Sequence, residues 1–419
     1  MINCEKRLLR NVGKINPVSS AQYCSTGGYK ALSSAIASTQ ENIIEVVKAS
    51  GLRGRGGAGF NTGTKWGFVK NTAADQKYIV CNADEGEPAT NKDRILMTGD
   101  PHALFEGMAI AGVAVGANKG YIYLRAEYPY VKTVLEAALN DARENGFLGT
   151  HVMDTNFSFD IEIRSGAGAY VCGEETALLE SIEGKRGEPR FKPPFPGVSG
   201  LWGKPTVINN VETFANIPII LNEGVESFRK YGTEKCPGTK LYTLCGNVSK
   251  PGVYEAPIGV TIRELLEELG GGVANGKKLK AVQTGGASGN IIPASLLDTP
   301  MDIESCSAAG ATFGAGDLMF IDEDQDIIDV CENLMEFFVE GSCGKCTPCR
   351  EGNYRVLELV RKFKDGTAKE EDIDTILELA DVMKDCSLCG LGQASTSPVV
   401  SAIRFFRSDF EKAIERGNK

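Results

Sequence analysis

The chain has 419 residues, of which 42% are apolar, enough for two to four folded domains with an ample core. Lysine and arginine number 45 against 55 aspartate and glutamate residues, and the net charge of −10 argues against a nucleic-acid binder. With only His102 and His151 present, histidine-based metal sites and Ser-His-Asp catalysis are poorly supported.

The cysteine content points to ligation and not to disulfides. No apolar run approaches the roughly 20 residues that span a bilayer, and "MINCEKRLLRN" lacks the apolar core of a signal peptide. We therefore expect a cytoplasmic protein with reduced thiols. Its thirteen cysteines, an odd number, then indicate metal or cluster ligands together with buried thiols.

The N-terminal half predicts helices followed by an α/β layer. Residues 1–47 predict a helical lead-in, and residues 48–238 alternate short β-rich runs with helices. The runs typical of strands are 77–83, 119–128 and 157–164. The runs typical of helices are 100–117, with Pro101 in its first turn, and 128–146, stopped by Gly146. Such alternation predicts a doubly wound or related parallel sheet.

The C-terminal half changes character twice. After a Pro/Gly-rich tract at 186–205, which is too dense in proline for regular structure, residues 239–322 predict a small β-rich unit. One helix, "TIRELLEELGG", is expected to pack across its sheet. Residues 323–419 predict helices, with a cysteine-rich segment between the first two of them.

That segment, "SCGKCTPCREG", spaces Cys343, Cys346 and Cys349 three residues apart, and Cys386 and Cys389 follow in "DCSLCGLG". Their polar and glycine neighbours disfavour plain buried thiols. A zinc site would need only the two Cys-x-x-Cys pairs and would leave Cys343 unexplained. The unbroken triple with one distant cysteine favours a [4Fe–4S] cluster, whose fourth ligand is then Cys386 or Cys389.

A glycine-dense stretch, "GLRGRGGAGFNTGTKWGF" (51–68), contains Arg53, Arg55 and Lys65. A backbone so free of side chains can wrap a phosphate or a flat ring, and its N–H groups can bind an anion. A flexible surface loop with solvated arginines is the alternative. Because no clear strand leads directly into it, the stretch predicts a phosphate-bearing ligand and no more.

Two further segments place carboxylates near predicted strand ends. "SGAGAYVCGEETALLESIEG" opens a helix, whose N-terminus suits Glu174 and Glu175. "CNADEGEPATNKDR" crowds Asp84, Glu85 and Glu87 into a turn after a strand. Ligands of open α/β sheets lie beyond the carboxyl ends of the strands, so both segments are expected to face one pocket. The aromatic residues expected on loops near a planar ligand are Phe60, Phe68, Tyr170 and Phe195.

The motifs "LRGRGGAGF", "CNADE", "GAGAYVCGEETAL", "KPPFP", "GLWGKPT", "NNVET" and "SCGKCTPCREG" occur in this order. In this combination the chain resembles the flavoprotein subunit of respiratory complex I and the NADH-oxidising subunits of soluble NAD-dependent hydrogenases and formate dehydrogenases. The resemblance implies a Rossmann-like domain for FMN and NADH at 48–238, a ubiquitin-like β-grasp domain at 239–322, and a C-terminal helical [4Fe–4S] domain at 323–419.

The resemblance also implies site residues. The flavin pocket falls on Gly54, Arg55, Gly56, Gly57, Lys65, Asn82, Asp84, Glu85, Gly173, Asn209, Asn210 and Thr213. The dinucleotide contacts fall on Phe60, Lys65, Phe68, Glu87, Tyr170, Glu175 and Phe195, with Glu174 beside them. The cluster ligands fall on Cys343, Cys346, Cys349 and Cys389, which leaves Cys386 spare.

The implied reaction is hydride transfer from NADH to FMN, followed by single-electron transfer to the cluster. No side chain is required as an acid or a base, and Glu85 and Glu175 are candidates for tuning the cofactors. NADH is favoured over NADPH because the acidic loop around Glu87 would repel a 2′-phosphate.

The chain departs from complex I members at Gly86, where serine is usual, and at Ala89, where glycine is usual. Glycine at the first position is familiar in the hydrogenase branch. That branch often carries a thioredoxin-like [2Fe–2S] domain and a ferredoxin-like extension. Cys4 and Cys24 lack the ligand pattern of the former, and nothing after the last motif resembles the latter, so we expect partners to supply those clusters.

These features predict an NADH-oxidising subunit of a hydrogenase or formate dehydrogenase complex. Its expected partners are a thioredoxin-like [2Fe–2S] subunit and an iron–sulfur catalytic subunit, with ferredoxin added if electrons are bifurcated. The alternatives are the flavoprotein subunit of membrane-bound complex I, beside its peripheral-arm subunits, and a non-catalytic cluster-binding scaffold. No nucleic-acid partner and no direct membrane insertion are expected.

Overall fold

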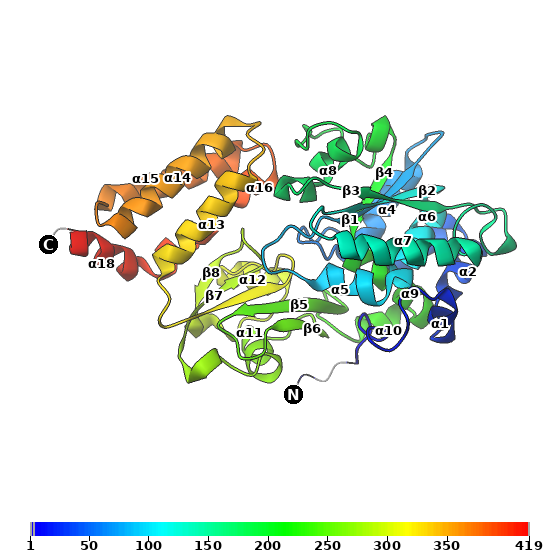
Figure 1. Cartoon of the computed structure of the whole chain (residues 1–419), viewed down its shortest axis with the longest axis horizontal. Coiled ribbons are helices and arrows are strands. Elements are labelled where there is room, and N and C mark those ends of the chain that lie inside the picture. The colour runs from blue at the N-terminus through cyan, green and yellow to red at the C-terminus, as the bar shows by residue number, and fades with distance from the viewer. Residues whose placement is uncertain (1, 3–4, 418–419) are drawn as a thin grey trace.

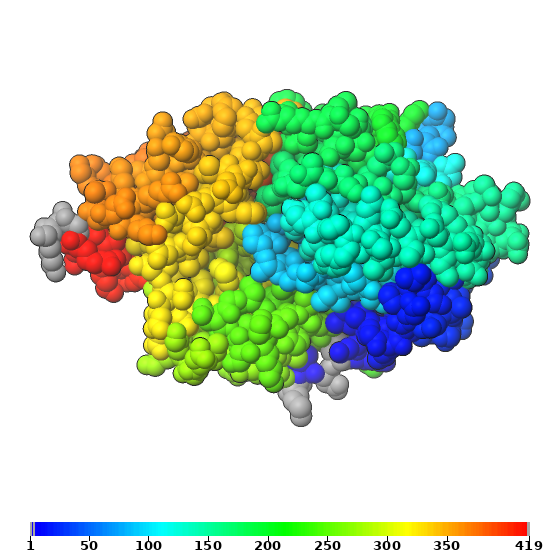
Figure 2. All heavy atoms as spheres, in the orientation of Figure 1, coloured from blue at the N-terminus to red at the C-terminus, as the bar shows by residue number. Residues whose placement is uncertain are grey.

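The computed structural model describes residues 2 and 5–417, so Cys4 lies outside the described residues. Three parts pack against one another: an α/β unit, a second unit built on a smaller sheet, and a C-terminal group of helices (Figure 1). The space-filling view shows the N-terminal residues, in dark blue, lying against the α/β unit (Figure 2). The predicted fold class is confirmed.

The α/β unit contains a four-stranded parallel sheet in the order β3-β2-β1-β4. The strands are β1 (Tyr78–Ala83), β2 (Lys119–Leu124), β3 (Asp160–Ser165) and β4 (Thr206–Asn210). The first three confirm the sequence predictions. The sequence does not predict β4, because its five residues follow the proline-rich tract directly and lead at once into a helix.

Helices cover this sheet and supply most of its core. They are α1 (Ser20–Ser25), α2 (Lys30–Ile36), α3 (Gln40–Ala49), α4 (Thr62–Asn71), α5 (Lys92–Gly99), α6 (Pro101–Val115), α7 (Pro129–Glu144), α8 (Glu175–Ile182), α9 (Val211–Glu223) and α10 (Val225–Arg229), with single turns η1 (Val152–Asp154), η2 (Tyr170–Gly173) and η3 (Leu201–Gly203). Helix α6 crosses α9 closely because it has glycine at position 107. A Cβ there would lie 2.1 Å from the Phe214 carbonyl oxygen.

The second unit is a five-stranded mixed sheet in the order β6-β5-β9-β7-β8, in which only β5 and β9 pair in parallel. Its elements are β5 (Thr239–Gly246), β6 (Gly252–Pro257), α11 (Ile262–Glu264), the π-helical turn η4 (Leu265–Leu269), η5 (Ala274–Gly276), β7 (Leu279–Thr284), β8 (Ile291–Pro293), η6 (Ala294–Leu296), α12 (Ile303–Ala309) and β9 (Asp317–Asp322). The predicted helix begins at Thr261, which forms a capping box with Glu264. Leu265 and Leu266 of that helix belong to the same buried core as Tyr242 and Leu318 of the sheet.

The C-terminal part consists of α13 (Ile327–Gly341), α14 (Thr347–Asp365), α15 (Glu370–Cys386), α16 (Gly390–Ala394), α17 (Ser397–Phe405) and α18 (Arg407–Gly417). The prediction that all three closely spaced cysteines lie between helices is wrong for Cys349. Helix α14 begins earlier than expected because Pro348 fits its first turn, so Cys349 is already helical.

Every cysteine within the described part of the chain is free. Searched over the same residues, no helix combines the length and apolar character of a membrane span. The domain boundaries stay a prediction. Helix α3 crosses the first of them, and residues of α2 and α3, such as Leu32 and Val47, share one core with Phe105 and Phe214.

Candidate functional site

The polar residues expected to bind a ligand meet where two parallel strands end. Strands β1 and β4 are neighbours, with Cys81 beside Asn209 and Asn82 beside Asn210. The chain continues from β1 outward through β2 and β3, whereas β4 lies on the other side of β1. This is a topological switch point, where open α/β sheets leave a crevice for ligands.

The glycine-rich loop approaches this edge from the segment before α4. It is closed by a hydrogen bond from the Gly54 N–H to the Phe60 carbonyl at 2.9 Å. A Cβ on Gly54 would meet no atom nearer than 3.7 Å, and one on Gly57 none nearer than 3.9 Å. Both distances are ordinary van der Waals contacts, so neither glycine is packed tightly against the protein at its Cβ position.

The side chain of Arg55 points away from that space. Its guanidinium is buried and donates to the Pro237 carbonyl at 2.8 Å, and its backbone N–H donates to the Thr213 hydroxyl at 2.9 Å. Asn210 lies under the loop, since a Cβ on Gly56 would come within 3.0 Å of the Asn210 Cβ. Of the residues predicted to bind flavin, Asn210 and Thr213 thus support the loop from below.

Asp84 presents an unsatisfied buried carboxylate oxygen at the end of β1. Its Oδ2 has no hydrogen-bond partner among the described residues. Burial raises the pKa of Asp84 to about 7, although Arg125 opposes the shift. The neighbouring Asn82 amide donates to the Gly173 carbonyl at 2.8 Å, which joins β1 to the turn η2. A ligand N–H group in this crevice would satisfy Asp84.

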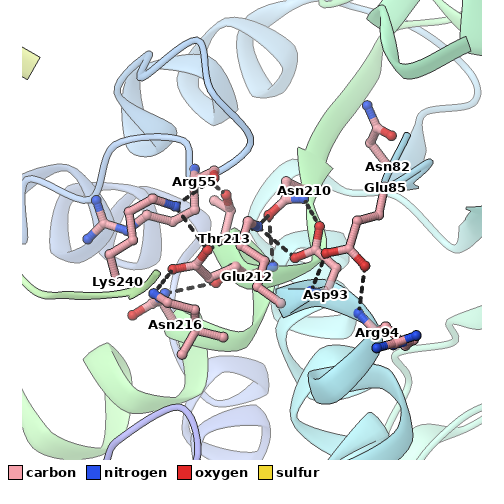
Figure 3. Close-up of polar contacts among 12 residues, drawn as sticks. Arg55, Asn82, Glu85, Asp93, Arg94, Asn210, Glu212, Thr213, Asn216 and Lys240 are labelled. Atoms are coloured by element: carbon pink, nitrogen blue, oxygen red, sulfur yellow. Dashed lines mark hydrogen bonds and ion pairs between the residues drawn. The ribbon is translucent and has the colours of Figure 1, made fainter. Parts of the chain in front are cut away.

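Glu85, expected in the flavin pocket, faces the start of α5. Its carboxylate accepts the N–H groups of Asp93 at 2.7 Å and Arg94 at 3.1 Å, and the Tyr128 hydroxyl at 3.0 Å (Figure 3). Burial and the Asp93 charge nevertheless raise the pKa of Glu85 to about 7. The geometry makes Glu85 an anchor of the turn that carries Asp84.

Glu87 links all three parts of the chain. Its carboxylate accepts the Tyr170 hydroxyl at 2.9 Å and also the N–H of Ala287, in the second unit. Burial raises the pKa of Glu87 to about 7. The ring of Tyr170 lies 4.8 Å from that of Phe337 in α13, the helix that leads to the cysteines.

Lys65, Glu174 and Glu175 lie together near the carboxyl end of β4. The Lys65 ammonium donates to the Ile208 carbonyl at 3.0 Å and lies 3.9 Å from the Glu175 carboxylate, and burial lowers its pKa. Glu174 caps α8 by accepting the N–H groups of Thr176 and Ala177, which confirms its expected capping role. Lys192 contacts both glutamates, at 2.9 and 3.0 Å.

Three of the four predicted aromatic residues are exposed. Phe60 is 49% exposed, and Phe68 and Phe195 are each 59% exposed, which leaves their rings free to stack on a planar group. The prediction that all four lie on loops is wrong for Phe68, because Asn61 caps α4 and places Phe68 inside the helix. Tyr170 lies in the single turn η2.

Four cysteines converge at the end of α13. Cys343, Cys346, Cys349 and Cys389 line one small cavity together with Val171 of η2, whereas Cys386 is exposed and does not line it. The Asn353 amide donates to the Cys349 sulfur at 3.4 Å, and the Leu388 N–H donates to the Cys346 sulfur at 3.5 Å. Four thiols around one cavity match the donor set that a cubic iron–sulfur cluster requires.

The donor set can be compared with the two metal hypotheses. A single zinc ion needs four ligands at about 2.3 Å from one centre, whereas each thiolate of a [4Fe–4S] cluster binds a different iron atom. Four cysteines around one cavity, with Cys386 outside it, match the number of thiolates that the cluster needs.

Sequence reasoning missed a buried ionic network beneath the glycine loop. Lys92 and Lys240 both reach the Glu212 carboxylate, at 3.0 and 3.2 Å, and Asp93 lies 2.8 Å from Lys92. Lys92, Glu212 and Lys240 are each at most 1% exposed. Figure 3 shows the contact between Lys240 and Glu212. The only sequence signal was charge within otherwise apolar segments, such as Lys240 in "TKLYTL".

The fold and the two sites define a class of protein: an α/β flavoprotein unit joined through a second sheet to an iron–sulfur-binding group of helices. Family models agree segment by segment. The Nuo51 FMN-binding domain matches residues 47–219, the SLBB domain residues 241–291, and the NADH-ubiquinone oxidoreductase-F iron–sulfur binding region residues 329–413.

Curated relatives extend over nearly the whole chain. NADP-reducing hydrogenase subunit HndC of Solidesulfovibrio fructosivorans is 46% identical over 97% of this chain and 83% of its own. An NADH-quinone oxidoreductase subunit of Rhizobium meliloti is 46% identical over 98% of both chains. The structure of an NAD⁺-reducing [NiFe]-hydrogenase in the H₂-reduced state aligns with a TM-score of 0.86 at 37% identity, over 98% of this chain and 67% of that one.

The chain therefore belongs to the NADH-ubiquinone oxidoreductase-F family, together with the corresponding hydrogenase subunits. It is an oxidoreductase subunit with an FMN-binding domain and a [4Fe–4S]-binding region. NADH binding fits the family as its iron–sulfur model and the Rhizobium meliloti relative are named, whereas HndC is named as NADP-reducing. The individual residues that bind these groups stay a prediction.

Proposed function

We propose that this chain is the NADH-oxidising subunit of a hydrogenase complex, with FMN in the β1–β4 crevice and a [4Fe–4S] cluster on the four thiols. The observation that carries the proposal is the buried Asp84 oxygen without a partner among the described residues, at the β1–β4 switch point that the glycine loop approaches. When bound, FMN accepts a hydride from NADH and the cluster accepts single electrons.

The residues of the chain would then bind the FMN and the NADH and orient them. The loop offers the backbone N–H groups of Gly56 and Gly57, since those of Gly54 and Arg55 already donate to Phe60 and Thr213. Asn82 and Asp84 border the crevice. Lys65 supplies a positive charge near the carboxyl end of β4. Exposed Phe68 and Phe195 are suited to stack on the adenine. Glu85 and Glu175 are candidates for tuning through their charge.

The turn η2 connects the two sites. Gly173 accepts a hydrogen bond from Asn82 at the crevice, and Val171, two residues away, lines the cavity of the four thiols. The turn η2 would therefore lie between an FMN bound in the crevice and a cluster held by the four thiols.

Two observations bear on the partner complex. HndC is named as a hydrogenase subunit, and the aligned structure is a hydrogenase. Gly86 stands where complex I members usually have serine, and a Cβ there would come within 3.0 Å of the Tyr170 ring. The second candidate is the flavoprotein subunit of complex I, which the relative from Rhizobium meliloti favours at equal identity.

We infer cytoplasmic assembly with a thioredoxin-like [2Fe–2S] subunit and an iron–sulfur catalytic subunit, and NADH rather than NADPH as the dinucleotide. Native protein isolated anaerobically, followed by mass spectrometry of the co-purifying chains, tests this. A hydrogenase large subunit supports the proposal. A formate dehydrogenase subunit or a set of complex I membrane-arm subunits overturns the assignment to a hydrogenase.

A further inference from the structure

A lysine of the second unit reaches the backbone of the glycine loop. Lys240 is the second residue of β5, and its ammonium donates to the Arg55 carbonyl at 3.1 Å while it pairs with Glu212 at 3.2 Å. Its side chain is 0% exposed. Figure 3 shows Lys240 and Arg55 on the same side of Glu212.

The second unit is shaped to place this lysine. Gly316, at a φ of +90°, lies just before β9, and a Cβ there would come within 2.5 Å of the Lys240 Cε. The ammonium also lies 5.8 Å from the centre of the Phe313 ring. Gly316 leaves room for the aliphatic stem of Lys240, and the Phe313 ring lies beside its charge. These two neighbours leave the ammonium little freedom other than to face the glycine loop.

Three hydrogen bonds hold residue 55, and Lys240 supplies the one to its carbonyl. The Arg55 N–H is held by Thr213, its guanidinium by the Pro237 carbonyl, and its carbonyl by Lys240. The Arg55 carbonyl and the Gly56 N–H belong to one peptide plane. Because glycine has little intrinsic preference for one conformation, the orientation of the Gly56 N–H depends on how Lys240 holds that carbonyl.

We propose that Lys240 is a positioning residue of the flavin site, by which the second unit holds the Gly54–Gly57 backbone in the conformation that binds FMN. This inference rests on the proposed function, since it takes the loop as the FMN site. The proposal gives the second unit, the predicted β-grasp domain, a direct part in cofactor binding.

The Lys240 ammonium loses its proton at a pH only slightly above neutral. Burial lowers its pKa to about 8, against the favourable charge of Glu212. The other charged groups that face it are Lys92 on α5, Arg55 in the loop and Asp317 at the start of β9. The pKa of Glu212 is lowered and that of Lys92 is raised, so neither changes charge between pH 7 and 9.

The test is FMN binding by the full chain with its cluster in place, measured by quenching of flavin fluorescence. We expect Lys240→Met to weaken FMN about tenfold or more, because a charged donor to the loop is lost. Lys277→Met is the matched control in the same unit, since Lys277 pairs with Asp322 and Asp324 near the surface. It is expected to bind FMN as the wild type does.

The pH dependence of FMN binding distinguishes a positioning role of Lys240 from a general loss of structure. The first half of this test uses the wild-type chain alone. Wild-type affinity for FMN is expected to fall more steeply between pH 7 and 9 than that of Lys240→Met, because the variant keeps only the titration of nearby carboxylates such as Asp84. Equal FMN affinity in wild type and Lys240→Met would overturn the inference, and so would the same pH dependence in the two proteins. If the wild type itself takes up no FMN, the proposed function fails instead.

Discussion

The Tyr170 hydroxyl donates to the Glu87 carboxylate at 2.9 Å, and this contact ties the end of β1 to the turn that leads toward the cysteines. Glu87 also accepts the N–H of Ala287, so the carboxylate joins the α/β unit to the β-grasp unit. Both residues are predicted dinucleotide contacts, and the bond between them sets their relative position.

Replacing Tyr170 by phenylalanine removes this donor and leaves the ring in place. We expect Tyr170→Phe to raise the KM for NADH about tenfold with unchanged FMN content, and to destabilise the chain by about 1 kcal/mol. NADH oxidation with an artificial one-electron acceptor measures the first effect, and urea unfolding the second. Tyr354→Phe, in an exposed position on α14, is the control, and an unchanged KM in Tyr170→Phe would contradict the assignment.

The raised pKa of Glu87 predicts a pH-dependent stability. The folded chain binds this proton more tightly than the unfolded chain, so the contribution to stability is largest below pH 4.5 and is lost as pH rises from 4.5 to about 7. Through Glu87, the free energy of unfolding is lower at pH 7.5 than below pH 4.5 by at most about 3 kcal/mol.

Glu87→Gln keeps an acceptor for Tyr170 and cannot ionise. We therefore expect Glu87→Gln to gain stability relative to wild type as pH rises from 5 to 7.5, by urea unfolding of the FMN-free chain. A constant difference between the two proteins over this range would mean that Glu87 is ionised normally in the folded state.

The cluster ligands are distinguished by a pair of serine substitutions three residues apart. Cys389 lines the cavity with the three closely spaced cysteines, whereas Cys386 is exposed at the end of α15. Iron content and the absorbance of the cluster are expected to collapse in Cys389→Ser and to persist in Cys386→Ser. Loss of iron in both variants, or in Cys386→Ser alone, would refute the ligand set.

Gly54 offers a substitution that spares the folded chain and blocks the ligand. A methyl group there meets no protein atom nearer than 3.7 Å, so Gly54→Ala is expected to change the free energy of unfolding by less than about 0.5 kcal/mol. Affinity for FMN is expected to drop at least about tenfold, which is about 1.4 kcal/mol. Gly252→Ala, at an ordinary position in β6, is the control for both measurements.

Local patterns in the sequence were sufficient to predict most strands of the parallel sheet and two of the helices that cover it. The strands β1, β2 and β3, the helices α6 and α7, and the capping role of Glu174 all follow from short-range periodicity and composition. The failures at β4 and Cys349 share a cause. Prolines at 205 and 348 argue locally against regular structure, although one precedes a strand and the other occupies the first turn of a helix.

The network of Lys92, Glu212 and Lys240 could not have been predicted by such reasoning. Each charge is isolated in its own segment, and only the fold brings α5, α9 and β5 together. The same holds for Glu87 and Ala287, whose contact joins two units. Pairings over such sequence separations depend on topology and leave no local pattern.

The most direct test of the account is an anaerobic titration of the reconstituted full chain with NADH, followed by flavin absorbance and by electron paramagnetic resonance of the cluster. We predict one FMN and four iron atoms per chain, and reduction of both groups by NADH in the absence of any partner subunit. A chain that takes up no FMN, or one whose cluster stays oxidised after the flavin is reduced, would contradict the claim that this single chain carries electrons from NADH through flavin to iron.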